Sequence, residues 1–381
     1  MYRAVPSVSH TFANSVKASY LRSSRPLVLA TFNSCRCLST STKSYNQSTL
    51  RSGKVDESAA KGVEGPHYAD ATTVVKHEHD LHTTGEIRGD WVLFHPVYSS
   101  NELKAIEPSV HYEGKTFADR WAHGLVRIAR RCFDLVSGYK NKQIPVGSTM
   151  SVAELRKEGY LMTEKGWLHR IIFLETIAGI PGMVAATIRH LHSLRLLRRD
   201  AGWIHTLLEE AENERMHLMT FLAIKKPGLL MRAIILGAQG VFYNVFFLSY
   251  LVSPRICHRF VGYLEEEAVH TYSKLIHEIE TGKFPEWADK QAPEIAKDYW
   301  RLSKDASYLD MIYAVRSDEA THRFVNHSLA NLKKGDVNPF AIREPDMTVK
   351  GMKYGFERDE AAQYVEESHK LLTSGKTSGA V

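Results

Sequence analysis

Apolar residues recur every three or four positions through most of the chain after residue 117, which is the spacing of one helical face. This pattern predicts helices over about 117–135, 164–199, 203–224, 229–252, 254–281 and 300–332. The run Gly179-Ile180-Pro181-Gly182 interrupts the second helix and should kink it. The sequence therefore predicts an all-α fold.

Four of these helices place a glutamate on the apolar face, where a leucine would be expected. These glutamates are Glu175, Glu214, Glu265 and Glu319. His217 and His322 follow two of them by three residues, so each pair shares one face of its helix, one turn apart. Such a pair can hold one metal ion, and we therefore expect the four helices to converge on a metal site.

Spacing alone does not select these residues. Glu267 with His270 and Glu366 with His369 have the same separation. Glu366 lies in a polar segment and not on an apolar face. Among the three glutamates at 265–267, the periodicity selects Glu265 as the inward one and leaves Glu266 to solvent. Glu209, Glu210 and Glu212, which precede Glu214 on the helix over 203–224, are likewise expected to face water.

Four buried, unpaired carboxylates would each cost several kcal/mol, more than a fold can tolerate. Two divalent ions would balance their charge. A ferritin-like bundle is built in this way, with one glutamate from each of two helices and Glu-x-x-His from the other two. Oxygen and nitrogen ligands suit iron or manganese. Tyr272, seven residues after Glu265, should lie near the metals. It either supplies an electron and a proton or only packs and hydrogen-bonds.

Two helices have an apolar surface suited to a membrane. The helix from Phe117 is amphipathic and basic, with Trp121 on its apolar stripe, and it either lies in a membrane interface or packs on a soluble core. The segment 229–252 is long enough to span a bilayer. However, Arg232 interrupts it, which favours a helix that enters one leaflet or packs on the bundle.

The charge of the chain is unevenly distributed. The net charge is +6 over 381 residues, but residues 1–55 contain eight Lys or Arg and no acid. The remainder is slightly acidic, so we expect no nucleic-acid partner. Residues 1–40 have the composition of a mitochondrial transit peptide, the alternative being a basic tail. Residues 41–116 are interpreted as a largely irregular arm with a histidine-rich run at His77–His82, and 336–381 as a polar C-terminal tail.

Four motifs resemble the signatures of the mitochondrial alternative oxidases. They are Leu174-Glu175-Thr176, Asn213-Glu214-Arg215-Met216-His217-Leu218, Leu264-Glu265-Glu266-Glu267-Ala268-Val269 and Arg316-Ser317-Asp318-Glu319-Ala320-Thr321-His322-Arg323. The resemblance covers roughly residues 90–335. Ser317 and Thr321 depart from the usual alanine and histidine, but neither is a ligand, so only local hydrogen bonding is affected.

The resemblance implies a cyanide-insensitive di-iron ubiquinol oxidase of the respiratory electron-transport chain, which reduces O₂ to water without pumping protons. It implies a ferritin-like bundle over 117–335 with two additional membrane-interface helices. The protein would be a monotopic homodimer on one lipid leaflet of the mitochondrial inner membrane, on the matrix side. No cysteine lies between residues 38 and 131, so redox control by an intersubunit disulfide is not expected.

The resemblance also assigns roles to residues. The iron ligands would be Glu175, Glu214, His217, Glu265, Glu319 and His322, and Tyr272 the redox-active tyrosine. The quinol pocket would contain Arg170, Leu174, Ala268 and Thr271. The residues that orient ligands or relay protons would be Asn213, Asp318, His258 and Trp300. Alternatives are a di-iron quinone hydroxylase, a plastid-type quinol oxidase, and a non-catalytic ferritin-like iron-binding bundle.

Overall fold

The computed structural model describes residues 98–140 and 142–373, all within one compact unit, Gly53–Val381. The described residues form helices and no strand. Those of the bundle and its neighbours are α5 (Phe117–Ser137), α7 (Glu164–Ala178), α8 (Ile180–Leu196), α9 (Trp203–Ile224), α10 (Leu229–Val252), α11 (Pro254–Glu280) and α13 (Tyr308–Asn331). Shorter or peripheral helices are α4 (Ser100–Lys104), α6 (Val152–Lys157), α12 (Glu294–Tyr299), α14 (Met347–Lys350) and α15 (Arg358–Thr373). The all-α prediction is confirmed. The expected transit peptide, the run His77–His82 and most of the arm lie outside the described residues.

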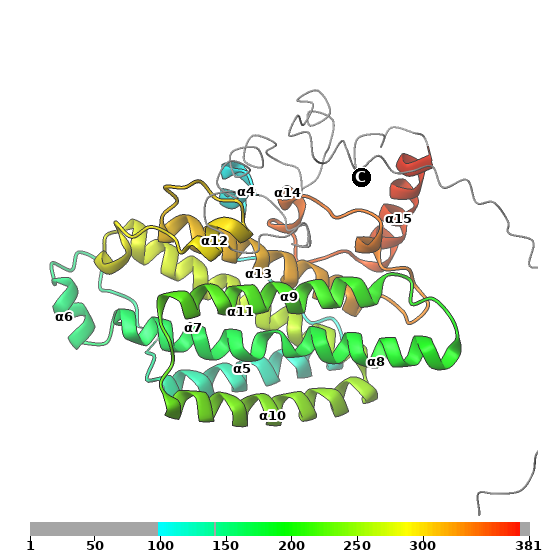
Figure 1. Cartoon of the computed structure of the whole chain (residues 1–381), viewed down its shortest axis with the longest axis horizontal. Coiled ribbons are helices and arrows are strands. Elements are labelled where there is room, and N and C mark those ends of the chain that lie inside the picture. Colours follow the sequence, from blue (N-terminus) through cyan, green and yellow to red (C-terminus); the bar gives the residue numbers. More distant parts are fainter. Residues whose placement is uncertain (1–97, 141, 374–381) are drawn as a thin grey trace, which may run out of the picture. The chain divides into compact units, whose positions relative to one another are not determined.

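A four-helix bundle of α7, α9, α11 and α13 forms the centre of this unit (Figure 1). One apolar cluster, which includes Trp167, Phe221 and Leu275, fills one part of its interior. A second, which includes Leu207 and Phe324, fills another. α13 is buried along almost its whole length, as expected for the innermost helix of the bundle. The arrangement fits a ferritin-like bundle.

The break between α7 and α8 falls at the predicted place. Gly179 caps α7, and Pro181 stands in the first turn of α8, where its missing N–H costs nothing. A Cβ atom added to Gly182 would lie 2.5 Å from the carbonyl oxygen of Leu207 on α9. Glycine therefore lets the two helices approach closely.

The last bundle helix begins later than the predicted residue 300. Trp300 is the C-cap of α12, and Arg301 follows in the left-handed region with φ 51°. α13 begins after Ser307, whose side chain accepts from the backbone N–H of Asp310 while the Asp310 carboxylate accepts in return. This capping box fixes the start of the helix, which the apolar stripe alone could not locate.

The C-terminal segment also differs from the polar tail that the sequence led us to expect. It contains α14 and α15, and its residues Met347 and Ala361 are buried against the bundle. Lys350 is buried too, with its ammonium 2.9 Å from a carboxylate oxygen of Glu344. Residues 336–373 therefore belong to the folded unit.

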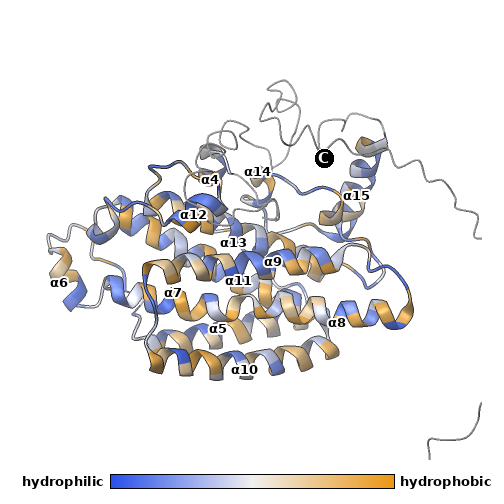
Figure 2. Ribbon diagram, in the orientation of Figure 1, coloured by the Kyte–Doolittle hydropathy of each residue, from blue (hydrophilic) through white to orange (hydrophobic). Residues whose placement is uncertain are grey.

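The apolar stripe of α5 faces away from the bundle. Phe117, Ile128 and Leu135 are 77%, 59% and 83% exposed, whereas small Ala122 packs inward. α10 lies along the same side of the bundle and is strongly apolar (Figures 1 and 2). Among the described residues, two segments are long and apolar enough to cross a membrane, 164–196 and 229–252. The most apolar 18-residue window is 50% buried in the first and only 11% buried in the second. Exposed apolar faces of this kind mark sites of interaction with a membrane or with another protein.

Candidate metal centre

The four inward glutamates and two histidines meet inside the bundle. α7 supplies Glu175, α11 supplies Glu265, and α9 and α13 each supply a glutamate and a histidine. All six side chains are at least nine-tenths buried. The six residues that the helical periodicity selected therefore lie together in the folded bundle.

Two groups of potential metal ligands share two of their members. The first group is Glu175, Glu214, His217 and Glu319, and the second is Glu214, Glu265, Glu319 and His322. Within each group the ligand atoms lie within 4.8 Å of one another. Glu214 and Glu319 occur in both groups, and each group adds one glutamate and one histidine of its own. The six residues could therefore hold two ions.

Several fully buried ligand atoms lie close to one another without making a regular hydrogen bond; Nδ1 of His322, for example, lies 2.7 Å from Oε1 of Glu214. These atoms are Oε2 of Glu175, both carboxylate oxygens of Glu214, and Nδ1 of His217 and of His322. Buried polar atoms without a hydrogen bond are rare because each costs about 1–3 kcal/mol. Cations that these atoms coordinate would remove that cost. The donor set therefore fits a di-metal centre of the carboxylate type.

The pKa values in the metal-free cluster also indicate that its negative charge lacks compensating cations. Burial raises the pKa of Glu175 to about 8 and also holds the pKa of Glu265 well above its ordinary value. Burial opposes the charged form of His322, but the carboxylate of Glu214 raises its pKa to about 9. The metal-free cluster therefore holds protons where divalent ions would bind.

Tyr272 lies directly beside the cluster, as predicted. Its hydroxyl donates a hydrogen bond to Oε1 of Glu175, and its ring stacks on Phe221. Burial and the neighbouring carboxylates raise the pKa of its phenol well above the ordinary value. The phenol proton therefore stays on Tyr272, one hydrogen bond away from a ligand carboxylate.

Asp318 anchors the first histidine. One of its oxygens lies 3.0 Å from Nε2 of His217 and accepts from Asn213 and Trp300 at 2.8 Å each. The other accepts from the hydroxyl of Tyr98 at 2.5 Å. A carboxylate that accepts from the outer ring nitrogen leaves Nδ1 free to face a metal. The sequence selected Asn213, Asp318 and Trp300 but missed Tyr98, because no periodic pattern connects it to the bundle.

His258 does not join that network. Its Nδ1 lies 3.1 Å from the side-chain oxygen of Asn326, and its Nε2 lies 3.0 Å from the hydroxyl of Tyr250. Asn326 in turn donates to Glu210 at 2.8 Å. Glu210 was expected to face water, and that prediction is wrong. It lies one turn before Glu214, and α9 is buried over a wider arc than one stripe because helices cover it on several sides.

Glu266 also differs from its prediction. Its carboxylate accepts from the backbone of Tyr112 at 2.9 Å and lies 2.8 Å from Nε2 of His327 and 2.6 Å from Nδ1 of His111. The side chain is only 12% exposed. It is thus mostly enclosed by α13 and by the segment before α5, which a single-helix periodicity cannot reveal.

The four residues expected in a quinol pocket lie on α7 and α11. Arg170 and Leu174 are on α7, and Ala268 and Thr271 are on α11. The guanidinium of Arg170 is buried, donates to Asp134 of α5 at 2.7 Å and also donates to the hydroxyl of Ser137.

An ion-pair network surrounds that arginine and was missed from the sequence. Arg130 lies 2.9 Å from the second oxygen of Asp134 and also contacts the carboxylate of Glu267 on α11. It joins α5, α7 and α11. The only sequence signal was Arg130 and Asp134 at an i, i+4 spacing, which is common on exposed helices.

Comparison with known proteins gives a consistent result. The profile of the family described as "Alternative oxidase" matches residues 98–331. A mitochondrial alternative oxidase of Cryptococcus neoformans var. grubii is 51% identical over 345 residues, covering 89% of this chain and 84% of that protein. Those of Emericella nidulans and Aspergillus niger are 50% and 52% identical, over 72% and 69% of this chain and 77% and 72% of their own.

Proposed function

This chain belongs to the alternative oxidase family, and from that premise we propose that it is a di-iron ubiquinol oxidase that reduces O₂ to water without pumping protons. The observation that carries the proposal is the pair of ligand groups that share Glu214 and Glu319. Two iron ions held there would supply the redox chemistry with O₂. An oxidoreductase role follows from the family; ubiquinol and the non-electrogenic reaction are the proposal.

The protein residues around the ions would position ligands and hold a proton. Asp318 orients His217, and Asn213 and Trp300 orient Asp318 through the bonds described above. Tyr272 holds a proton on its hydroxyl beside Glu175. We assign to it the transfer of this proton, together with one electron, to an oxygen atom derived from O₂; a ubiquinol would then return one electron and one proton to the tyrosine. The apolar cluster around Phe221 and Leu275 would exclude bulk water from this side.

We place ubiquinol between α5, α7 and α11. Arg170 would donate a hydrogen bond to a quinone oxygen, and Leu174 and Ala268 would contact the ring, with Thr271 beside them. Asp134 and Ser137 hold the arginine in place from α5. α5 also carries the outward apolar stripe, so an apolar substrate would reach the pocket from a membrane on that side.

The same outward faces support the proposed location. The relatives are named mitochondrial proteins, and we assign this chain to the mitochondrial inner membrane on the matrix side, as a homodimer. The exposed apolar faces of α5 and α10 would enter one lipid leaflet. The arginines beside the α5 stripe suit the polar headgroup region.

The test is oxygen uptake by the purified protein with a soluble ubiquinol in the presence of cyanide. We expect one O₂ consumed for every two quinols oxidised. A hydroxylated quinone as product would indicate a quinone hydroxylase, and oxidation of plastoquinol alone would indicate the plastid-type oxidase. Bound iron without any quinol-dependent oxygen uptake would indicate a non-catalytic iron-binding bundle. Any of these three results would contradict the proposal.

A further inference from the structure

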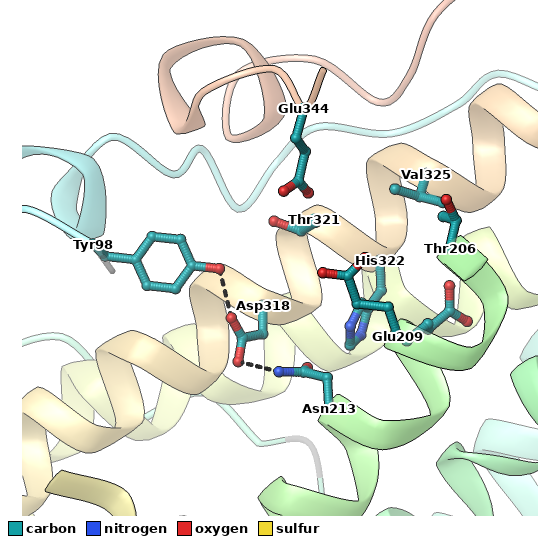
Figure 3. A pocket seen from close by; sticks show the side chains of 10 residues that line it. Tyr98, Thr206, Glu209, Asn213, Asp318, Thr321, His322, Val325 and Glu344 are labelled. Atoms are coloured by element: carbon teal, nitrogen blue, oxygen red, sulfur yellow. Dashed lines mark hydrogen bonds between the residues drawn. The ribbon is translucent and has the colours of Figure 1, made fainter. Parts of the chain in front are cut away.

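A cavity of about 40 Å³ lies beside the ligand cluster, between α9 and α13 (Figure 3). Nine polar residues and Val325 line it, although carbon atoms make up the larger part of its surface. His322 and Asp318 form part of its wall, so it touches one ligand histidine and the carboxylate that anchors the other. Tyr98 and Glu344, from the segments before α4 and α14, complete it. In Figure 1 those helices lie across the bundle from α10.

The cavity connects the buried cluster with the part-exposed surface of the bundle. Asp318 and His322 are 2% and 5% exposed. Glu209 and Glu344, which line the same cavity, are partly exposed. Most of its other lining residues are also polar, including Thr206 and Thr321. A single water needs roughly 10–15 Å³ and two to four polar partners, so this space can hold about three waters.

The proposed reaction creates a need for such a path. Two ubiquinols release four electrons and four protons, which convert one O₂ into two waters, so no further protons are consumed. The two waters form in a closed interior. The proposed quinol site beside Arg170, Leu174, Ala268 and Thr271 would be filled by substrate. Product water therefore needs a second exit.

We propose that this cavity is the water exit of the metal centre, leading from His322 and Asp318 past Glu209 and Glu344 to the aqueous phase. The inference rests on the proposed function, since it assigns the path of that reaction's product. It separates the two routes in space: quinol enters from the side of α5, and water leaves between α9 and α13.

A crystal structure of the iron-loaded protein at a resolution that resolves waters tests the path without any activity measurement. We expect ordered waters, hydrogen-bonded between the carboxylates of Glu344 or Glu209 and the Asp318–His322 wall. A dry cavity, or one closed by side chains, would overturn the proposal. Hydrated protein without quinol oxidation would instead contradict only the proposed function.

Val325 offers a matched pair of variants, because it lines the cavity, belongs to the second apolar cluster and is not one of the candidate metal ligands. Val325→Phe should fill the cavity and lower kcat roughly five-fold or more, since product release then limits turnover. KM for ubiquinol and bound iron should stay unchanged. Val325→Ala enlarges the cavity and should retain the parental kcat.

Val325→Leu is measured alongside, as a smaller increase in volume that the fold tolerates more readily. Its kcat should lie between those of the parent and the phenylalanine variant. Parental kcat in a folded variant whose cavity is shown to be filled would refute the exit path. Equal losses in Val325→Ala and Val325→Phe would also refute it, because they would reflect disturbed packing.

Discussion

At the residue scale, we expect replacement of either glutamate that occurs in both ligand groups to reduce activity and bound iron the most. Glu214 is 1% exposed and lies in both groups, and its carboxylate oxygens lie 2.7 Å from Nδ1 of His322 and 3.5 Å from Nδ1 of His217. Its replacement removes a member from both ligand groups at once. Glu175 and Glu265 each belong to one group only.

Glu214→Ala should lower ubiquinol oxidation roughly a thousand-fold or more, because both ligand groups lose a shared member. Bound iron per chain should fall in parallel. Glu212→Ala is the control on the same helix, since Glu212 is partly exposed and pairs with Arg215. An active, iron-replete Glu214→Ala protein would refute the ligand assignment.

Tyr272→Phe should keep the iron but reduce turnover about a hundred-fold, the usual loss when a positioned proton donor is removed. The phenol contributes one hydrogen bond to Glu175, and the ring stacking on Phe221 survives the change. Iron content and kcat are measured on the same preparation. Normal turnover would leave Tyr272 with only a packing role.

At the scale of the elements, the contact between α8 and α9 depends on a glycine. The Cβ position of Gly182 is blocked by the Leu207 carbonyl at 2.5 Å, whereas that of Gly237 on α10 meets nothing within 4 Å. The same substitution should therefore have opposite effects at the two sites. The break at Gly179 and the start of α13 after Ser307 are also set by single residues, because Gly179 is the C-cap of α7 and Ser307 the N-cap of α13.

Gly182→Ala should lower the free energy of unfolding by about 1–3 kcal/mol, because the backbone of α9 must move to admit the methyl group. Gly237→Ala should be neutral or stabilise by roughly 0.5–1 kcal/mol through helix propensity. Thermal unfolding of the two variants in one buffer compares them directly. Equal effects at both positions would contradict the close approach of α8 and α9.

At the scale of the whole folded unit, the metal ions and the fold should stabilise each other. Without cations, Glu175 has a pKa near 8 against 4.5 for an ordinary glutamate, and His322 has a pKa near 9 against 6.5. Both groups bind more protons in the folded state than in the unfolded state. Their contribution to the stability of the metal-free protein therefore falls as pH rises.

The chelator-treated protein should lose stability as pH rises from about 6 to 8, while the iron-loaded protein should change little over that range. The ions should raise the melting temperature most at pH 8, because they then compensate the charge of carboxylates that have lost their protons. Thermal unfolding at several pH values, with and without iron, measures this difference. A metal-free protein that becomes more stable toward pH 8 would contradict the charge balance of the cluster.

The sequence by itself determined the all-α class, the break at Gly179 and the six side chains of the candidate metal centre. These follow from helical periodicity, because a glutamate on an apolar stripe must enter the interior of its own helix bundle. The family resemblance, itself a property of the sequence, led to the proposals that ubiquinol is the substrate and that the protein lies on the matrix side of the membrane.

Only the tertiary structure decided which polar groups are enclosed by more than one helix. Glu210 and Glu266 fall off the single-helix stripes, yet neighbouring elements cover both. Tyr98 reaches Asp318 across 220 positions, and Asp134 joins Arg170 from another helix. The outward direction of the α5 stripe and the cavity beside His322 also depend on how the helices pack. Periodicity describes one helix at a time, and these features arise between helices.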